Sequence, residues 1–292
     1  MSIDKLQDRI RKLKNPSVVD FGIRPEHLPP HLLQVHDSFA CAYEQFCKEL
    51  LQGLVDVVAG VRFSMNSMAA IGPEGVLLLK DLMRTAQSLG YYVILDGPNV
   101  LSAQEAEFLA DLLLNPEQGW QFDGLVLSPY IGSDGLKPFA MGLKNVDKDL
   151  FVVVRSANRT APELQDLLTG SRLVHLAAAD VVKRFAEPMP ARCGYSRIAA
   201  VAAATSADSL RTLREKYKSL FFLLDGYDYP GANAKNCSYA FDKLGHGAAA
   251  CAGTSITAAW LDTPGDAQEY VTLAVEAAQR MKKNLTRYIV LL

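Results

Sequence analysis

The sequence predicts an α/β protein whose eight strand–helix units close into a (β/α)8 TIM barrel. Apolar, strand-like runs recur along the 292 residues, and helical stretches separate them. Most runs are continuously apolar, as is typical of parallel strands that helices cover on both faces. Eight such units in roughly 250 to 300 residues fit a closed barrel. An open doubly wound sheet is the alternative, but no GxGxxG motif follows the first strand, which disfavours its dinucleotide-binding form.

The first predicted element is an amphipathic helix within residues 1–16, where Ile3, Leu6, Ile10 and Leu13 recur at helical spacing. The strands predicted after it are residues 17–22, 56–64, 91–96, 124–128, 150–155, 197–201, 219–225 and 247–251. The helices predicted between strands from apolar periodicity include residues 74–89, 104–114 and 209–217. No linker divides the chain. We therefore expect one domain over residues 1–292, with the helix at 1–16, the barrel at 17–260 and a helical segment at 261–292.

Composition and charge disfavour several classes of protein. The chain is 49% hydrophobic and 21% charged, with a net charge of -2 at pH 7, so neither nucleic acid nor an anionic membrane is favoured as a partner. No apolar run reaches the roughly 18 residues that would span a bilayer. The segment MSIDKLQDRIRKLKNP is charged and lacks the apolar core of a signal peptide. The expected location is the cytoplasm.

The cysteines and histidines give no sign of a metal site. The five cysteines form no CxxC pair, and no His–Glu spacing of a metal-binding helix is present. An odd number of cysteines also argues against a disulfide framework. We expect buried thiols and no metal.

In a TIM barrel the active site lies at the carboxyl ends of the strands, so the residues just after each strand are the candidates for function. These positions are 24, 62–64, 96–99, 128–130, 155–158, 225–227 and 251–254. The apolar run 93–95 delivers Asp96 to this rim as a carboxylate at the end of a buried strand. The next residues, Gly97, Pro98 and Asn99, favour turns and carry no charge. A carboxylate presented there lacks charged neighbours in its own segment.

Several segments resemble the orotidine 5'-monophosphate decarboxylase family, in its longer bacterial subfamily. They are VILDGPN at 93, LSPYIGSDGLKPF at 127, VVVRSANRTAPELQDL at 152, FFLLDGYDYPGAN at 221 and GHGAAACAGTSI at 245. The order of the segments and the chain length agree with the family as well. The resemblance implies a (β/α)8 barrel and a homodimer with active sites at the subunit interface. It also implies decarboxylation of orotidine monophosphate to UMP without metal or organic cofactor.

The resemblance also shows where this chain departs from the family. The family motif after the third strand reads Asp-Ala-Lys-Arg-Gly-Asp-Ile, and its lysine protonates the carbon that loses CO2. In this alignment Asp96 keeps the first aspartate, Pro98 replaces the lysine and Leu101 replaces the second aspartate. Elsewhere, Arg24 stands for the first-strand aspartate and Arg62 for the second-strand lysine. The remaining changes are Ala157 for the serine that reads the pyrimidine, Pro230 for the phosphate-loop glutamine and Thr254 for the phosphate-gripping arginine.

The resemblance and the rim positions together select the candidate site residues. Asp96 and Arg62 are the remnants of the catalytic array, and the candidate substrate-binding residues are Arg24, Asp134, Arg155, Asn158, Gly226, Gly253 and Thr254. Each has a structural alternative. The two aspartates could cap a turn or a helix, and Arg24 and Arg62 could pair with Asp20 and Asp96 in a structural network. Turn geometry alone would explain the glycines.

Retention of the framework with loss of ligand positions predicts a divergent paralogue that is defective in decarboxylation and keeps a scaffold or ligand-binding role. Its ligand would be a nucleotide or another small anion. One alternative is an orotidine 5'-phosphate decarboxylase with an unusual active site. Another is new chemistry on a different anion, which would use Arg24, Arg62 and Asp96. We expect a homodimer, because Val100 and Leu101 add apolar surface near the family's interface.

Overall fold

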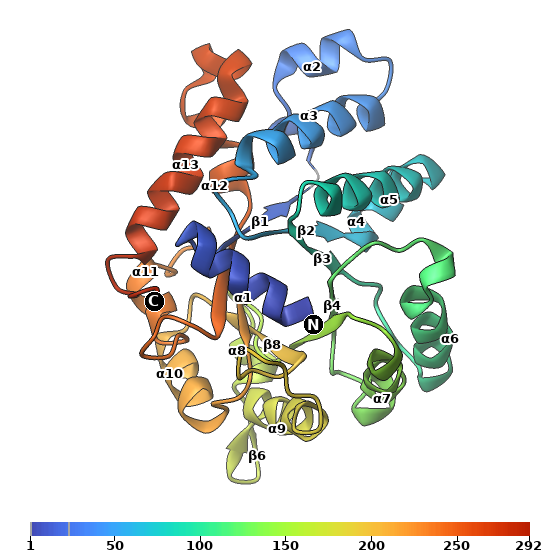
Figure 1. The fold of residues 1–292 in the computed structure, drawn as a ribbon, viewed down its shortest axis with the longest axis vertical. Coiled ribbons are helices and arrows are strands. Elements are labelled where there is room, and N and C mark those ends of the chain that lie inside the picture. The colour runs from blue at the N-terminus through green and yellow to red at the C-terminus, as the bar shows by residue number, and fades with distance from the viewer. Residues whose placement is uncertain (1, 23) are drawn as a thin grey trace.

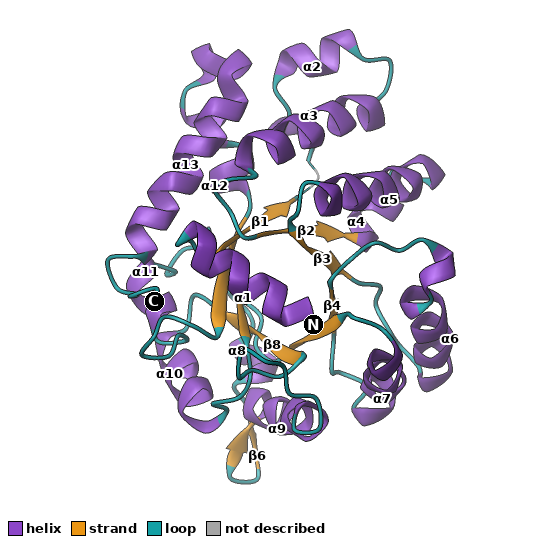
Figure 2. Ribbon diagram, in the orientation of Figure 1, coloured by secondary structure: helices purple, strands orange, loops and turns teal. Residues whose placement is uncertain are grey.

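Eight parallel strands form a closed barrel in the computed structural model, which describes residues 2–22 and 24–292. The barrel strands are β1 (Ser17–Phe21), β2 (Gly60–Ser64), β3 (Tyr92–Asp96), β4 (Gly124–Leu127), β5 (Asp149–Val153), β8 (Ile198–Ala203), β9 (Phe222–Asp225) and β10 (Ala248–Ala252). Around the barrel their order is β1-β10-β9-β8-β5-β4-β3-β2. Figure 2 shows the strands as an inner ring and the helices outside it. The predicted (β/α)8 class is therefore confirmed.

Helices follow most strands, as the alternating pattern predicted. They are α1 (Ser2–Leu13), α2 (Pro30–Val35), α3 (Phe39–Leu54), α4 (Met65–Ala69), α5 (Pro73–Ser88), α6 (Ala103–Leu114), α7 (Ser133–Gly142), α8 (Pro162–Gln165), α9 (Val174–Ala186), α10 (Ala207–Lys216), α11 (Ala234–Ser238), α12 (Thr254–Thr257) and α13 (Tyr270–Leu285). The predicted helices at 74–89, 104–114 and 209–217 correspond to α5, α6 and α10, each within two residues at its ends. In the described part of the chain, no helix is both long and apolar enough to cross a membrane.

The N-terminal helix α1 closes the amino end of the barrel. Figure 1 shows it lying across the barrel opening. Its apolar residues Ile3, Leu6 and Ile10 are fully buried in one cluster with side chains from inside the barrel. The hydroxyl of Ser2 donates to the carbonyl of Asp123, directly before β4. The amphipathic helix that this spacing predicted therefore acts as a plug at the amino end of the barrel. The carboxyl end remains the open face.

Aromatic side chains fill the barrel interior above this plug. The rings of Tyr92 and Phe151 meet edge to face at 6.3 Å, and those of Phe151 and Phe221 at 6.4 Å. Both are typical distances for aromatic pairs. The larger apolar cluster lies between the outward faces of the strands and the helices. Burial on both faces explains why the strands read as continuous apolar runs.

Some boundaries differ from the prediction. The second strand begins at Gly60 rather than at residue 56, because the amides of Val57 and Val58 bond back to the carbonyl of Leu54 and complete the turn after α3. The sequence also gave no sign of the antiparallel hairpin β6 (Leu168–Thr169) and β7 (Arg172–Leu173). Each of its strands has two residues, which is too short for a periodicity to be visible.

The strand register brings charged residues together at the open face. Asp20 of β1 pairs with Arg62 of β2, and Ser64 of β2 pairs with Asp96 of β3. Asp225 ends β9, opposite Ala203 of β8. We call this open carboxyl end of the barrel the mouth.

Candidate functional site

The centre of the mouth is occupied by the guanidinium of Arg62. Its Nη2 donates to Oδ2 of Asp96, and its Nη1 donates to Oδ1 of Asp225 at 2.9 Å. Nη1 also lies 3.9 Å from Oδ2 of Asp20. The Arg62 side chain is only 10% exposed, whereas each carboxylate is about one third exposed. One buried cation thus serves three carboxylates from three other strands.

This charge balance fixes the protonation of Arg62. Burial alone would lower the pKa of the guanidinium, but the carboxylates of Asp20, Asp225 and Asp96 raise it well above its ordinary value. An arginine proton that is already held tightly is held more tightly here. Arg62 therefore acts as a fixed cation and cannot donate a proton in a reaction at neutral pH.

The pKa of Asp20 is also raised, but for a carboxyl group this favours the uncharged form. Burial raises the pKa of its carboxyl to about 6, with repulsion from Asp225 and Asp96 adding to the rise and Arg62 opposing it. The single guanidinium does not fully compensate three carboxylates. The mouth therefore carries a net negative charge when all three are ionised.

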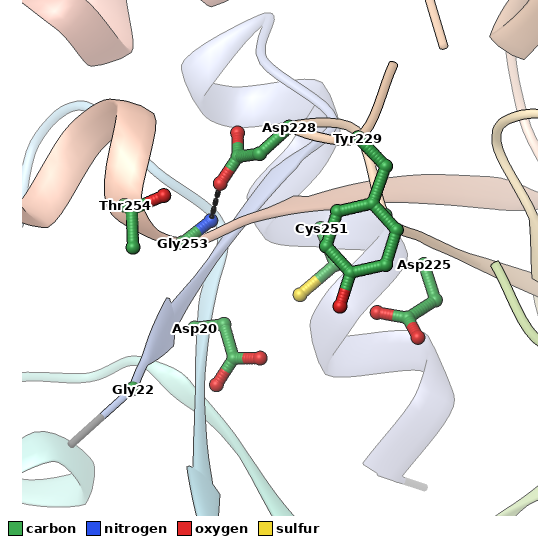
Figure 3. A pocket seen from close by; sticks show the side chains of 9 residues that line it. Asp20, Gly22, Asp225, Asp228, Tyr229, Cys251, Gly253 and Thr254 are labelled. Carbon is green, nitrogen blue, oxygen red and sulfur yellow. Dashed lines mark hydrogen bonds between the residues drawn. The ribbon is translucent and has the colours of Figure 1, made fainter. Parts of the chain in front are cut away.

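A pocket of about 210 Å³ opens beside this cluster, and we call it the mouth pocket. Its lining residues are Asp20, Gly22, Asp225, Gly226, Asp228, Tyr229, Cys251, Gly253 and Thr254. Figure 3 shows the carboxylates of Asp20 and Asp225 and the ring of Tyr229 around it. Gly226 has φ +76, and a Cβ there would lie 2.3 Å from Cβ of Ala157, so both conformation and space require glycine. The side chains offer acceptors to a ligand, and their donors are the hydroxyl groups of Tyr229 and Thr254 and the thiol of Cys251.

The loop between β10 and α12 already holds an anionic group. Oδ2 of Asp228 accepts from the amide of Gly253 at 2.6 Å and from that of Ser255 at 3.4 Å. The hydroxyl of Ser255 donates to Oδ1 of the same carboxylate. Figure 3 shows the Asp228 side chain directed at the Gly253 amide. The backbone donors of this loop are thus used by the protein's own carboxylate.

A second pocket of about 230 Å³ lies across the mouth, and we call it the second mouth pocket. It is lined by Ser64, Asn66, Asp96, Gly97, Pro98, Asn99, Val126, Leu127, Ser128 and Val153. Pro98 therefore does face the mouth, as its place after β3 suggested. Among the described residues, no lysine lines either pocket. The carboxylate of Asp96 is the charged group of the second pocket, and Arg62 already pairs with it.

Arg155 and Asn158 lie outside both pockets. Arg155 is buried and donates from Nε and Nη2 to the two oxygens of Asp166, at 3.1 and 2.8 Å. The Asp166 carboxylate also lies 3.1 Å from Nδ1 of His175. The pKa of Asp166 is lowered, mainly by its hydrogen bonds from Arg155. This pairing joins the end of β5 to the segment after α8, which is a structural use of Arg155. Asn158 is exposed and bonds locally to Thr160.

Arg24 and Asp134 are also outside both pockets. Arg24 is 69% exposed and its Nη1 lies 3.6 Å from a carboxylate oxygen of Glu26. Asp134 is exposed in the first turn of α7, where a negative charge favours the helix. The structure thus brings Arg62, Asp96, Gly226, Gly253 and Thr254 to the mouth, and not the other four candidates.

Three acidic residues of the mouth pocket are not among the candidate site residues that the sequence selects. The resemblance selects Arg24 in place of Asp20, which the sequence suggests only as a partner for an arginine. Asp225 ends a predicted strand, and Asp228 follows it by three residues. The strand-end rule was the signal for Asp20 and Asp225. The sequence predicts a turn at Gly226 but does not indicate that this turn directs Asp228 at Gly253. The described residues contain no group of three histidine, cysteine or acidic side chains placed to hold a metal.

Comparisons with known proteins agree on one family. No family model matches the chain. A curated relative named orotidine 5'-phosphate decarboxylase, from Rhodopirellula baltica, is 30% identical over 247 residues, which cover 81% of this chain and 82% of the relative. One of the same name from Clostridium novyi is 24% identical over 98% of both chains.

Solved structures match over a similar extent. A putative orotidine-monophosphate decarboxylase from Toxoplasma gondii has a TM-score of 0.76 at 20% identity, covering 96% of this chain and 98% of that one. A putative orotidine 5'-phosphate decarboxylase from Streptomyces avermitilis has a TM-score of 0.77 at 18% identity, covering 97% and 95%. At such low identity these two structures support the barrel fold alone.

Proposed function

Because the chain belongs to the orotidine 5'-phosphate decarboxylase family, we propose that it is a divergent member that has lost decarboxylation and keeps the barrel as a scaffold or ligand-binding protein. The observation that carries the proposal is the pairing of Arg62 with Asp20, Asp96 and Asp225.

Decarboxylation needs a proton donor beside the reacting carbon of the substrate. Decarboxylation of orotidine monophosphate leaves negative charge on a ring carbon, so a cation must lie beside that carbon and then protonate it. Pro98 has no proton to give. Arg62 is the cation of the mouth, but its carboxylate partners raise its pKa well above the ordinary value. A group that holds its proton this tightly is a poor general acid.

The substrate also needs a site at the mouth that binds its phosphate. Remote binding energy from a substrate phosphate helps to position the reacting group. Here the amides of Gly253 and Ser255 are engaged by Asp228, and Thr254 carries no charge. A phosphate at this loop would have to displace a carboxylate and would meet the carboxylates of Asp20 and Asp225. We therefore expect any nucleotide to bind weakly.

Assembly and location are part of the same proposal. We propose a cytoplasmic homodimer, supported by family membership and by Leu101, whose side chain is 77% exposed in the single chain. Val100 does not contribute as expected from the sequence, because it is 6% exposed and packs in the core of its own chain. Leu101 alone of this pair is available to a second subunit.

An assay of the purified protein tests the central claim. Orotidine monophosphate is incubated with the protein, and UMP formation is followed by chromatography, with the Rhodopirellula baltica relative assayed in parallel. We expect no UMP from this chain. Formation of UMP, or growth of a uracil-requiring decarboxylase mutant on the unmodified gene, would refute the proposal.

The alternative function is an active orotidine 5'-phosphate decarboxylase with an unusual site. The observation that favours it is the 30% identity to the Rhodopirellula baltica relative over 81% of this chain. Asp96 is also retained at the end of β3. The same assay separates the two candidates, because the alternative requires turnover and the proposal forbids it.

A further inference from the structure

A separate cleft lies on the outer side of the barrel, between the start of α11 and the end of α13. These two helices lie side by side (Figure 1). The cleft measures about 540 Å³, compared with about 210 Å³ for the mouth pocket. It is lined by Tyr227, Ala232, Asn233, Ala234, Lys235, Asn284, Arg287 and Tyr288. Its volume falls in the range of sites that bind small molecules.

The charged lining residues of this cleft are both cations. Lys235 comes from the first turns of α11, and Arg287 follows α13. Neither side chain has a hydrogen bond or ion pair with another described residue. Both side chains are exposed, so an anion that enters the cleft can reach them. Two positive charges that face one cleft, with no carboxylate in its lining, attract an anion into it.

Neutral donors stand beside the two cations. Oδ1 of Asn233 accepts from the amide of Asn236 at 2.9 Å, which leaves the side-chain NH2 of Asn233 to donate. Burial raises the pKa of Tyr227 to about 12, with Asn284 contributing a smaller change in the other direction. The Tyr227 hydroxyl therefore keeps its proton at neutral pH and can donate. Donors with cations and no carboxylate are the chemistry that recognises oxyanions.

We propose that this cleft binds a small polyvalent oxyanion, a metabolite that carries phosphate or carboxylate groups. Lys235 and Arg287 supply the charge, and Asn233 and Tyr227 direct hydrogen bonds at the ligand. The site does not depend on the proposed function, because the mouth and the cleft share no lining residue. It does contact the mouth loop, since Tyr227 lies between Gly226 and Asp228.

Calorimetric titration with two probes, pyrophosphate and citrate, tests the proposal. We expect at least one probe to bind. The double variant Lys235→Ala/Arg287→Ala should lose affinity by about tenfold or more, since it removes two charge-assisted contacts. Lys283→Ala is the matched control, because Lys283 is exposed on α13 but does not line the cleft, and it should bind as the unmodified protein does.

The outcomes separate cleanly. Binding of pyrophosphate alone assigns the cleft to phosphate groups, binding of citrate alone assigns it to carboxylates, and both support the proposal. Absence of binding at millimolar concentration overturns it, and so does equal affinity in the double variant. Thermal unfolding without ligand shows that the double variant is folded, which is expected because both side chains are exposed.

Discussion

Nη1 of Arg62 lies 2.9 Å from Oδ1 of Asp225, although the two residues are 163 positions apart and their strands are not neighbours in the barrel. Strands β1 and β10 separate β2 from β9. The contact therefore crosses the mouth rather than running along the sheet. It places one cation in contact with acids from three strands, and the charge of the mouth depends on it.

Replacing Arg62 should destabilise the fold. Arg62→Leu leaves Asp20, Asp96 and Asp225 without their common cation, and we expect the free energy of unfolding to fall by about 2 kcal/mol, below the range for a fully buried pair because the carboxylates are partly solvated. Urea denaturation at pH 7 measures this. Arg211→Ala, which removes an exposed arginine, is the control and should change stability little. An Arg62→Leu protein as stable as the original would contradict the role of the cluster.

Asp20 should make stability depend on pH in a defined direction. Its folded-state pKa of about 6 exceeds the ordinary value of 3.8. The folded protein thus binds this proton more tightly than the unfolded chain does. The stability that the folded protein gains from binding this proton is fully present below about pH 4 and is lost as pH rises through 6.

At pH 7.5 Asp20→Asn should therefore be more stable than the original protein and unfold at a higher urea concentration. We expect the free energy of unfolding to rise by about 1 kcal/mol. The gain is limited because solvent reaches part of the side chain and screens its charge. Near pH 4 the difference should vanish. Asp37→Asn, the same change at an exposed position, is the control variant. A less stable Asp20→Asn protein at pH 7.5 would show that Asp20 is needed as an anion.

Pro98→Lys should not restore decarboxylation. The new lysine would face the second mouth pocket, but Leu101, Ala157 and Thr254 would still differ from the family pattern. The measurement is UMP formed from orotidine monophosphate by the variant and by the original protein. We expect none from either. Turnover by the variant alone would mean that the proton donor is the single missing group.

Removing the Asp228 carboxylate should increase affinity for phosphate groups. Asp228→Ala releases the amides of Gly253 and Ser255 and removes a negative charge, so UMP should bind about tenfold more tightly than to the original protein. Equilibrium dialysis measures the affinity. Asp228→Asn keeps an acceptor oxygen for the loop while losing the charge, and an intermediate gain is expected. Equal affinity in all three proteins would argue that Asp228 does not control this loop.

Leu101 should report on assembly. In a homodimer its side chain would be covered, so Leu101→Glu would place a charge in an apolar contact and shift the protein toward monomer. Light scattering at micromolar concentration measures the mass. Phe108→Glu makes the same kind of change at another exposed apolar residue, which lies on α6. A monomeric original protein would contradict the proposed dimer.

The barrel class and helices such as α5, α6 and α10 could be predicted because apolar periodicity is a local property of the chain. The run 93–95 of β3 and the residues of β4 are apolar, and α5 and α6 repeat at helical spacing. The hairpin β6–β7 could not be found this way. Its two-residue strands are too short for a pattern.

By itself the sequence determined the fold class, the placing of Asp96 at a strand end and the absence of a lysine from the loop that follows it. Only the tertiary structure decided which charges meet. Closing the barrel brings Asp225 to Arg62 across two intervening strands, and the turn at Gly226 aims Asp228 at Gly253. Arg24 shows the reverse case, because a position that alignment places in the site lies exposed beside Glu26. Strand order, register and the direction of each side chain are properties of the closed barrel, and local spacing along the chain does not contain them.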